Sequence, residues 1–303
     1  MKQDFETSEL KAELERALGF RLKTLVRLDG ASALNFRAER EDDGLVFAVK
    51  CSPKRRQTMF DHLVCHLRET AGTKAVQRLF AETCPPTFRR YNVICLSWCE
   101  GRRLFPDQLT DAQLVAFLDD YQAFSAAMQK ATGIAPHDPT TRWREQAIIH
   151  CRGFWGGFLR RLIERELPLR KVTYRPELLK VVHGDFHHGN FLFVDGRVNG
   201  FFDLEEFCEG YPADDIVRYF VCAAEHLKGF GIRRLGRLLA HFKTAVRHLP
   251  YPAEEWEVAI NALLLRKLYM KTQDGRVGPW QAANLLYRAR LYHKMKRLLP
   301  SVL

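Results

Sequence analysis

Residues 180–204 read KVVHGDFHHGNFLFVDGRVNGFFDL, and this stretch differs in pattern from the sequence around it. Short apolar runs that are typical of strands flank a polar loop containing glycine, and Asp195-Gly196 is a dipeptide typical of tight hairpin turns. Elsewhere, the chain beyond Gly101 mostly has the apolar periodicity of helices. The stretch is therefore a β island, with its own polar loop, inside a helical region.

The loop of this island carries a carboxylate and an amide at an informative spacing. His183, Asp185 and Asn190 form the pattern H-x-D-x-x-x-x-N, which also occurs in the catalytic loop of kinases. Phosphoryl transfer needs an acceptor oxygen in line with the γ-phosphate and hard oxygen ligands that hold Mg²⁺ on the phosphates. A strand-like run then leads to Asp203, in the place where kinases have a second Mg²⁺-binding aspartate. The spacing thus predicts a site for phosphoryl transfer.

Three motifs of this region resemble the aminoglycoside phosphotransferase and choline kinase superfamily. HGDFHHGN (183–190) is similar to that family's H-G-D-x-x-x-x-N, FFDLEE (201–206) to its metal-binding I-D-x-[DE] strand, and GYPADDI (210–216) to its G-x-P-x-x-D-[LI] segment. The resemblance implies a two-lobed, protein-kinase-like fold. It also implies transfer of the γ-phosphoryl group of ATP, with Mg²⁺ as metal cofactor, to a hydroxyl of a small molecule.

The resemblance assigns roles to the acidic and amide residues of these motifs. Asp185 would be the catalytic base or the group that orients the acceptor hydroxyl. Asn190 and Asp203 would be the Mg²⁺ ligands. Glu205 would be an auxiliary acid near the metal, with a solvated acid in a turn as the alternative reading.

The remaining polar residues of the motifs are expected to be structural. His183 would hold the loop, since a histidine beside an apolar strand is usually a hydrogen-bonded structural residue. Asp215 would cap or buttress the loop from the following helix. His187 and His188 are adjacent, so their side chains point apart and bring no third ligand for a metal.

The N-terminal third has a different pattern. Residues 21–50 alternate strand-like runs with turns, which predicts an antiparallel meander. LVFAVK (45–50) resembles the kinase strand whose terminal lysine contacts the α- and β-phosphates, so Lys50 is the candidate, with an ordinary strand-end lysine as the alternative. A helix is expected over about 55–71. Its acid partner for Lys50 is Asp61 or Glu69, and the family pattern slightly favours Asp61.

Two further segments are candidates for nucleotide contacts. In LDGASALN (28–35), Gly30 would let backbone N–H groups approach phosphate and Ser32 would donate to it, with a plain hairpin turn as the alternative. LSWCEG (96–101) resembles the family's hinge, where backbone groups at Ser97 and Cys99 would meet adenine. Because backbone groups would recognise the base, the sequence does not distinguish ATP from GTP.

These patterns predict an α+β fold of two lobes. A small antiparallel β N-lobe is expected over residues 1–98 and a larger helical C-lobe over 99–303, with helices at about 142–166, 215–248, 253–273 and 279–298. The sequence has no uninterrupted run of 18 or more apolar residues, so no transmembrane span is expected. The N-terminus is polar and lacks the layout of a signal peptide, so a cytoplasmic protein is expected.

The net charge of +11 is concentrated in two segments. Residues 141–180 hold ten Lys or Arg against four Asp or Glu, and residues 264–299 hold nine against the single acid Asp274. Such an excess attracts anions, and the alternative is a solvated surface. Nucleic acid would explain the charge but not the motifs, so it is not an expected partner, whereas contact of the basic C-lobe with a membrane surface stays open.

The charge also bears on the acceptor. The family builds its acceptor pocket from the final helices, and their basic residues would repel a polycation such as an aminoglycoside. We therefore expect a neutral or anionic acceptor, with a sugar favoured. If those basic faces point outward, a pocket lined by acids would remain, with Asp107, Asp119, Asp120 or Glu205 as its members. The alternatives are a kinase of lipopolysaccharide-core-type sugars at the membrane surface and a nucleotide-binding pseudokinase. The oligomeric state cannot be inferred.

Overall fold

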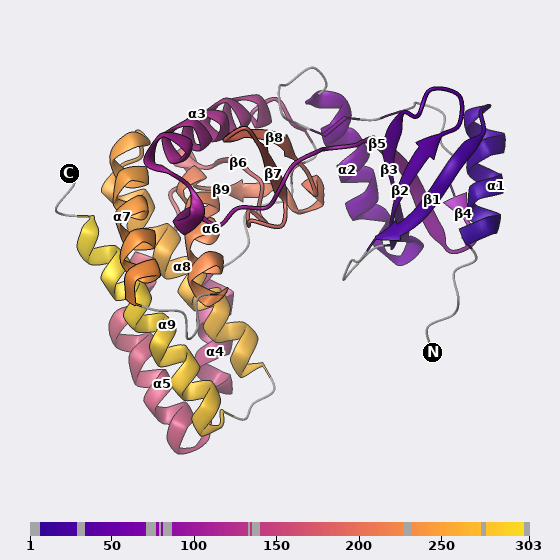
Figure 1. The fold of residues 1–303 in the computed structure, drawn as a ribbon. Coiled ribbons are helices and arrows are strands. Elements are labelled where there is room, and N and C mark those ends of the chain that lie inside the picture. The colour runs from indigo at the N-terminus through magenta and orange to yellow at the C-terminus, as the bar shows by residue number, and fades with distance from the viewer. Residues whose placement is uncertain are drawn as a thin grey trace.

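The computed structural model has a β-rich N-terminal part and a helical C-terminal part (Figure 1). It describes residues 7–28, 34–70, 77–78, 80, 87–132, 134, 140–226, 232–273 and 277–299.

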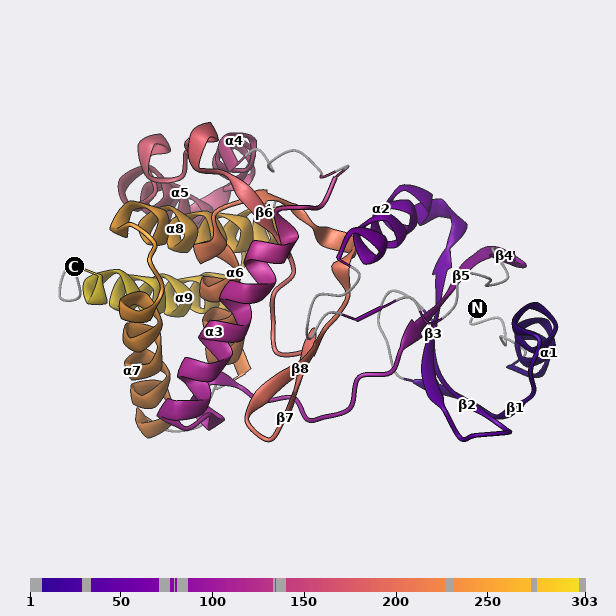
Figure 2. The ribbon, with the colours of Figure 1, turned by 90° about the horizontal axis from the view of Figure 1, so that it is seen from above.

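The N-terminal part is a five-stranded antiparallel sheet with the strand order β1-β2-β3-β5-β4. Strands β1 to β3 are the predicted meander. Helix α1 covers one face of the sheet and helix α2 lies on the other (Figure 2). The elements are α1 (Thr7–Leu18), β1 (Leu22–Leu28), β2 (Leu34–Arg40), β3 (Val46–Pro53), α2 (Gln57–Glu69), β4 (Thr87–Phe88) and β5 (Tyr91–Ser97).

Strand β3 shows why this sheet can present a lysine to the rest of the molecule. Side chains alternate between the two faces of a strand. Phe47, Val49 and Cys51 are fully buried in the core that the sheet shares with α1. Ala48 and Lys50 therefore point to the opposite face, toward α2, and Ala48 packs against the core of the helical part. Lys50 is thus directed at the junction between the two parts.

The C-terminal part is a group of helices around a small β island. Helix α8 is apolar on nearly all sides, as expected for a helix in the middle of a core, and its neighbours α4, α6 and α9 pack against it. The helices are α3 (Asp111–Met128), α4 (Thr140–His150), α5 (Gly153–Glu166), α6 (Pro212–His226), α7 (Ile232–His248), α8 (Ala253–Thr272) and α9 (Pro279–Leu298). The strands are β6 (Lys180–Val182), β7 (Phe191–Val194), β8 (Arg197–Phe201) and β9 (Cys208–Gly210).

The β island has the predicted hairpin. Strands β7 and β8 pair antiparallel, and the turn residues Asp195 and Gly196 have φ of 50° and 81°, so both are left-handed as a tight two-residue hairpin turn requires. Strand β6 pairs instead with β9. Phe191, the first residue of β7, and Phe186, in the loop before it, are buried, and their rings contact Phe117 of α3 and Tyr219 of α6. Buried aromatic rings therefore anchor the loop between β6 and β7 to the helices.

Local signals of the sequence also locate helix boundaries. At the start of α3, Gln113 N–H donates to the Thr110 hydroxyl (3.2 Å), and the Gln113 side chain accepts from Thr110 N–H (2.9 Å). This is the predicted capping box. The helix expected over 142–166 is in fact two, α4 and α5. The chain breaks before α5 because Gly153 is left-handed, with φ of 74°.

The predicted fold class is confirmed: a small antiparallel sheet precedes a larger helical part. The lobe boundary at residues 98 and 99 stays a prediction. Gly101 follows it, and a Cβ there would lie 2.6 Å from the Phe193 carbonyl oxygen, so only glycine lets the chain pass beside β7. Within the described residues, no helix is both long and apolar enough to span a membrane.

Candidate active site

The loop between β6 and β7 begins at a position that only glycine can occupy. Gly184 has φ of 76°, and a Cβ there would lie 2.0 Å from the Glu206 carbonyl oxygen. This close approach joins the loop to the turn that follows β8, so the predicted catalytic and metal motifs lie together. The left-handed backbone and this close contact therefore explain why the H-G-D motif needs a glycine at position 184.

His183 and Asp215 hold the loop in place. The Asp215 carboxylate accepts hydrogen bonds from the backbone N–H groups of His183 (2.9 Å) and Gly184 (3.2 Å). The His183 ring accepts at Nδ1 from Asp185 N–H (3.3 Å), so its Nε2 donates to the Phe202 carbonyl oxygen (2.9 Å). Both side chains are buried and face the protein. Their contacts are the structural ones expected from the sequence.

Asp185 lies in a ring of donors. Its carboxylate contacts an Arg218 guanidinium nitrogen at Oδ1, and His187 Nε2 at Oδ2 (3.4 Å). The Asn190 amide donates to the Asp185 carbonyl oxygen (2.9 Å) and lies 3.4 Å from its Oδ2. Burial raises the pKa of Asp185, but the hydrogen bond from His187 and the charge of Arg218 outweigh it and hold the pKa well below its usual range. Asp185 is therefore a carboxylate at neutral pH.

Arg218 is the site residue that sequence reasoning missed. It lies on α6 and contacts both the Gly184 carbonyl oxygen and the Asp185 carboxylate. Its side chain is largely buried. The signal that could have found it is its spacing from Asp215, because residues three apart on a helix share a face. Because Asp215 on α6 was expected to contact the loop, Arg218, three residues later on the same helix face, could have been expected to contact it as well.

The side chain of Lys50 extends from β3 of the sheet to the helical part. Its ammonium lies 2.6 Å from Asp203 Oδ1 and 2.5 Å from Glu205 Oε1. Burial would lower the pKa of Lys50, but the charges of Asp203 and Glu205 outweigh it and the pKa is raised. The lysine is therefore a buried cation between two carboxylates that follow it by more than 150 residues in the chain.

Asp203 has a backbone conformation that is unusual for a residue with a side chain. Its φ and ψ are 64° and 51°, in the left-handed region. Such residues carry strain of about 1–3 kcal/mol and are concentrated at functional sites. The left-handed conformation of Asp203 leads the chain into the 3₁₀ segment Leu204–Glu206. The Asp203 carboxylate is left half-exposed beside Lys50.

Asn190 and Asp203 fit a magnesium ion that is bound with a nucleotide. Within the described residues, no group of three His, Cys, Asp or Glu side chains could hold a metal by itself. Mg²⁺ prefers one or two carboxylates together with substrate phosphates and water. The Asp203 carboxylate and the Asn190 Oδ1, whose Nδ2 bonds to Asp185, supply such oxygens. Glu205 fits less well, because Lys50 already contacts its buried carboxylate.

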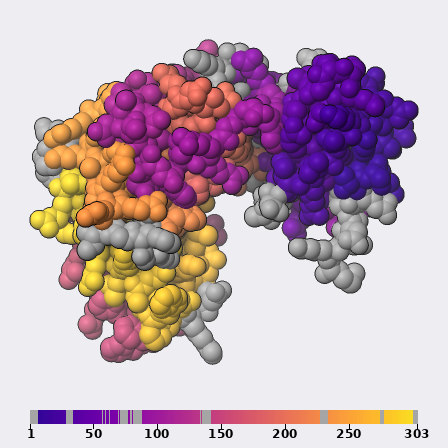
Figure 3. Space-filling view, viewed as in Figure 1, coloured from indigo at the N-terminus to yellow at the C-terminus, as the bar shows by residue number. Residues whose placement is uncertain are grey.

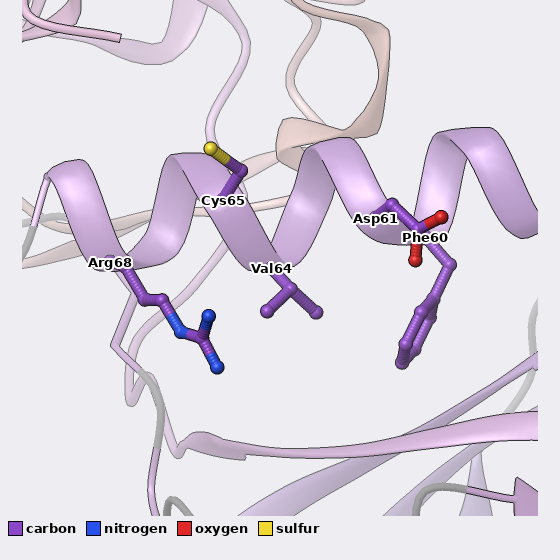
Figure 4. A pocket seen from close by; sticks show the side chains of 5 residues that line it. All are labelled: Phe60, Asp61, Val64, Cys65 and Arg68. Atoms are coloured by element: carbon purple, nitrogen blue, oxygen red, sulfur yellow. The ribbon is translucent and has the colours of Figure 1, made fainter. Parts of the chain in front are cut away.

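The helix partners predicted for Lys50 lie on α2. Asp61 is exposed and lines a cavity of about 500 Å³ (Figure 4). The carboxylates that contact Lys50 in the structure are those of Asp203 and Glu205, so the predicted pairing with Asp61 stays a prediction. Glu69 is the last residue of α2, and its side chain lies outside what the structure describes. The cavity is lined by Phe60, Asp61, Val64, Cys65 and Arg68.

The other predicted nucleotide contacts are described only in part. Gly30 and Ser32 lie outside the described residues. Ser97 ends β5, and its backbone already bonds to a neighbouring segment: its N–H donates to the Arg78 carbonyl oxygen (2.7 Å) and its carbonyl oxygen accepts from the Gln77 side chain (3.0 Å). Cys99 follows β5, outside any helix or strand. Within the described residues its backbone makes no hydrogen bond, so Cys99 keeps groups that could meet a base.

A notch separates the two parts on one side of the molecule. Figure 3 shows it between the indigo N-terminal part and the yellow and pink helices of the C-terminal part. Helix α2 packs against the 3₁₀ segment Leu204–Glu206, so the two parts also contact each other directly. The contact of Lys50 with Asp203 therefore lies where the two parts meet.

The comparisons with known proteins identify the family. A model of the phosphotransferase enzyme family matches residues 24–256. The chain belongs to this family. It is an enzyme, an ATP-dependent phosphotransferase that acts on a hydroxyl of a small molecule, and the superfamily suggested by its motifs is confirmed. Helix α9 lies beyond the matched residues. No curated protein sequence matches the chain.

The phosphotransferase has the fold of several solved structures over nearly its whole length. An amicoumacin kinase, solved with AMP-PNP and Ca²⁺, is 13% identical with a TM-score of 0.65 over 96% of each chain. A choline/ethanolamine kinase family protein from Mesorhizobium loti is 14% identical with a TM-score of 0.63 over 97% of this chain and 99% of that one. An aminoglycoside phosphotransferase from Alicyclobacillus acidocaldarius is 14% identical with a TM-score of 0.63 over 100% and 96%. At such identities the likeness shows the fold alone.

Proposed function

We propose that this phosphotransferase transfers the γ-phosphoryl group of ATP to a hydroxyl of a neutral or anionic acceptor, such as a sugar or a sugar phosphate. The observation that carries the proposal is the meeting of Lys50 with Asp203 across the two parts, beside the loop that holds Asp185 and Asn190. These are the charged and amide groups that a phosphoryl-transfer site needs.

In this reaction the acceptor oxygen forms a bond to the γ-phosphorus, and the bond from phosphorus to the β–γ bridging oxygen breaks. ADP leaves with the bonding electrons, and the hydroxyl proton passes to Asp185 and then to solvent. Asp185 is ionised, so it can accept a hydrogen bond from the hydroxyl throughout. Its low pKa makes it a weak base, which suits a proton that leaves late, once the oxygen has bonded to phosphorus.

The remaining residues position the phosphates. Lys50 would contact the α- and β-phosphates in exchange for part of its contact with Asp203 and Glu205. Asn190 and Asp203 would be ligands of Mg²⁺, which when bound would neutralise charge on the β- and γ-phosphates. Glu205 would keep Lys50 in place, and the Cys99 backbone would meet the base. Gly30, Ser32, Asp61 and Ser97 remain candidates for nucleotide contacts. We also propose Mg²⁺ as the metal and the cytoplasm as the location.

The four acidic residues named above as the lining of an alternative acidic pocket are paired with protein groups. Asp107 bonds to Arg234 (2.6 Å), Asp119 to His248 (2.7 Å), and Asp120 to Arg197. Glu205, the fourth candidate, contacts Lys50. A site for an aminoglycoside would need carboxylates that converge on the ligand, and these four are directed at protein groups. Their pairing supports an acceptor without multiple positive charges.

The basic residues of the final helices are also partly neutralised. Lys267 of α8 and Arg288 of α9 both contact the Glu225 carboxylate of α6, at 3.5 Å and 2.6 Å. Two cations share one anion, so the cluster keeps an excess of one positive charge. The net positive charge near these helices is therefore smaller than their composition implies. It is still positive, so it would still repel a polycation.

The pseudokinase alternative is excluded, because the chain belongs to a family of phosphotransferase enzymes and has Lys50, Asp185, Asn190 and Asp203 at the motif positions. An acceptor at a membrane surface, such as a lipopolysaccharide-core-type sugar, is the second candidate, and an exposed surface of α5 favours it.

The test is a screen for acceptors with purified enzyme, Mg²⁺ and ATP. The panel contains neutral sugars, sugar phosphates, choline-like amines, kanamycin-type aminoglycosides and lipid-linked glycans, and the readout is ADP release together with the mass of the phosphorylated product. We expect turnover with a sugar or sugar phosphate, and competitive inhibition by sugar phosphates that weakens as salt rises. Efficient, saturable phosphorylation of a kanamycin-type acceptor would refute the proposed acceptor class.

A further inference from the structure

Helix α5 exposes aromatic side chains to solvent. Phe154 is 84% exposed, Phe158 44% and Trp155 38%, and the rings of Phe154 and Trp155 pack edge to face with centroids 5.3 Å apart. The opposite side of the helix is buried, through Gly156, Leu159 and Ile163. The helix is therefore apolar on two sides: one faces the core, and the other is not covered by any described residue.

This surface is unlike the isolated apolar residues that all proteins expose. Phe154 and Phe158 are four residues apart and so lie one above the other, with Trp155 beside them. Ile149, near the end of α4 and four residues before Gly153, is 61% exposed as well. Contiguous exposed aromatic residues usually mark an interaction site.

Exposed arginines lie within and on either side of α5 in the sequence. Of the basic residues in and around α5, Arg160 pairs with Glu164, and Arg165 with Glu166. The others are exposed and form no ion pair within the described residues: Arg152, Arg161 and Arg170. The segment from 152 to 170 holds five arginines against two glutamates, an excess of three positive charges. We call Phe154, Trp155, Phe158, Arg152, Arg161 and Arg170 the α5 surface.

The charge selects among the possible partners. A second copy of the chain, docked symmetrically, would bring the same arginines against each other, and such like-charge contact is unfavourable. An anionic lipid bilayer offers an apolar region for the aromatic residues of the α5 surface and negative charge for its arginines. Aromatic rings enter the boundary between head groups and acyl chains, while arginines fork onto lipid phosphates. The combination is typical of a helix that lies on a membrane.

We propose that the α5 surface docks this enzyme on an anionic lipid bilayer. Helix α5 lies in the helical part, far from the sheet in both views (Figures 1 and 2). Docking there leaves the contact of Lys50 with Asp203 free, so it brings an intact enzyme to the membrane surface. The inference goes beyond the proposed reaction and does not depend on the identity of the acceptor.

The experiment measures binding of the whole protein to vesicles. One set of vesicles is phosphatidylcholine and the other is phosphatidylcholine with phosphatidylglycerol, and the bound fraction is obtained by co-sedimentation at low and high salt. We expect the wild type to bind the anionic vesicles, to bind the neutral ones much less, and to dissociate as salt rises.

Two variants of the α5 surface and one control complete the design. The variants are Phe154→Ser/Trp155→Ser/Phe158→Ser and Arg152→Gln/Arg161→Gln/Arg170→Gln. The control, Val26→Ser/Leu45→Ser, removes exposed apolar residues of the N-terminal part, Val26 in β1 and Leu45 just before β3. Each variant of the α5 surface should lower the partition coefficient by roughly ten- to a hundred-fold, and the control should not change it. Because all these side chains are exposed, thermal unfolding should show that every variant is folded.

Other outcomes would overturn the proposal. Equal binding of the wild type to neutral and anionic vesicles, or no binding to either, contradicts it. So does unchanged binding of the aromatic variant. A dimer in size-exclusion chromatography that the aromatic variant abolishes, without vesicle binding by the wild type, would instead assign the surface to self-association. These readouts do not involve turnover, so failure of the proposed function would leave the result intact.

Discussion

Asp185 is held by three side chains, one from α6 and two from its own loop. Arg218 reaches its carboxylate from α6, Asn190 from the end of the same loop, and His187 from the loop itself. Because Arg218 and His187 keep the carboxylate ionised, it can accept a hydrogen bond from the acceptor hydroxyl, and it would hold the transferred proton only briefly. The carboxylate and the guanidinium that contacts it should therefore respond differently to substitution.

The first prediction removes the charge of the carboxylate. Asp185→Asn should keep binding of Mg·ATP, because the proposed ligands of the metal are elsewhere, while kcat falls by about 10²–10⁴. The measurement is steady-state turnover with the acceptor found in the screen, beside nucleotide titration. Asp195→Asn, a matched change in the hairpin turn, is the control. Unchanged turnover in Asp185→Asn would show that another group orients the acceptor.

The second prediction concerns Arg218, which acts through Asp185. Without the guanidinium, the pKa of Asp185 rises, so the carboxylate loses its charge at a higher pH. In Arg218→Gln we expect the acidic limb of the kcat/KM profile to move to higher pH by about one to three units. Arg218→Lys should restore part of the shift.

The control for that experiment is Arg197→Gln, which breaks the pair with Asp120 at a distance from the loop. A merely structural Arg218 would lower activity equally at every pH, and a profile of unchanged shape in Arg218→Gln would therefore exclude the positioning role.

At the scale of elements, the start of α6 fixes the loop and the strand β9 together. Asp214 accepts a hydrogen bond from the Tyr174 hydroxyl (2.8 Å) and another from Tyr211 N–H (2.8 Å). Burial, the largest cause, raises the pKa of Asp214 to about 7, against 3.8 for an ordinary aspartate, although both hydrogen bonds lower it. The folded protein therefore keeps a proton on Asp214 at pH values where the unfolded chain has lost it.

The third prediction follows from this sign. Between about pH 4 and 7 the folded state binds more protons at Asp214 than the unfolded state, so the stability that Asp214 contributes is lost as pH rises. Asp214→Asn cannot lose a proton. The difference in Tm, wild type minus Asp214→Asn, should fall as pH rises through this window. A difference that stays constant from pH 4 to 8 would show that Asp214 does not titrate in this way.

Elements with local causes were predictable from the sequence. The hairpin turn at Asp195-Gly196 and the capping box at Thr110 depend on residues a few positions apart, and both are found. The division of 142–166 into α4 and α5 was not predicted, because the glycine that breaks the helix lies in an otherwise continuous apolar pattern. Short-range chemistry thus locates most elements but not every break between them.

At the scale of the whole molecule, the site depends on contacts that sequence patterns do not report. The carboxylate partners of Lys50 come from the helical part, and Glu205, read as an auxiliary metal acid or a solvated turn acid, is buried against Lys50. Which acid meets this lysine is decided by how the two parts pack. The motifs predicted that residues 183–190 and the strand before Asp203 carry the site, and these roles stay predictions, whereas the contacts of Arg218 and of Glu205 could be found only in the structure.

The central claim is that Lys50, Asn190 and Asp203 bring the two parts together around Mg·ATP. If Asp203 supplies an anionic oxygen to the metal, Asp203→Ala should lose Mg²⁺-dependent nucleotide affinity although the fold survives. Lys50→Ala should lose less, since a lysine is one of several phosphate contacts.

The measurement that tests this most directly is calorimetric titration of ATP into the purified protein, with and without Mg²⁺, because it needs no knowledge of the acceptor. The exposed Glu206, three residues from Asp203, gives the matched control Glu206→Ala. We expect saturable, Mg²⁺-dependent binding by the wild type and by Glu206→Ala, and its loss in Asp203→Ala. Wild-type affinity for Mg·ATP in Asp203→Ala would show that Asp203 is not a ligand of the metal.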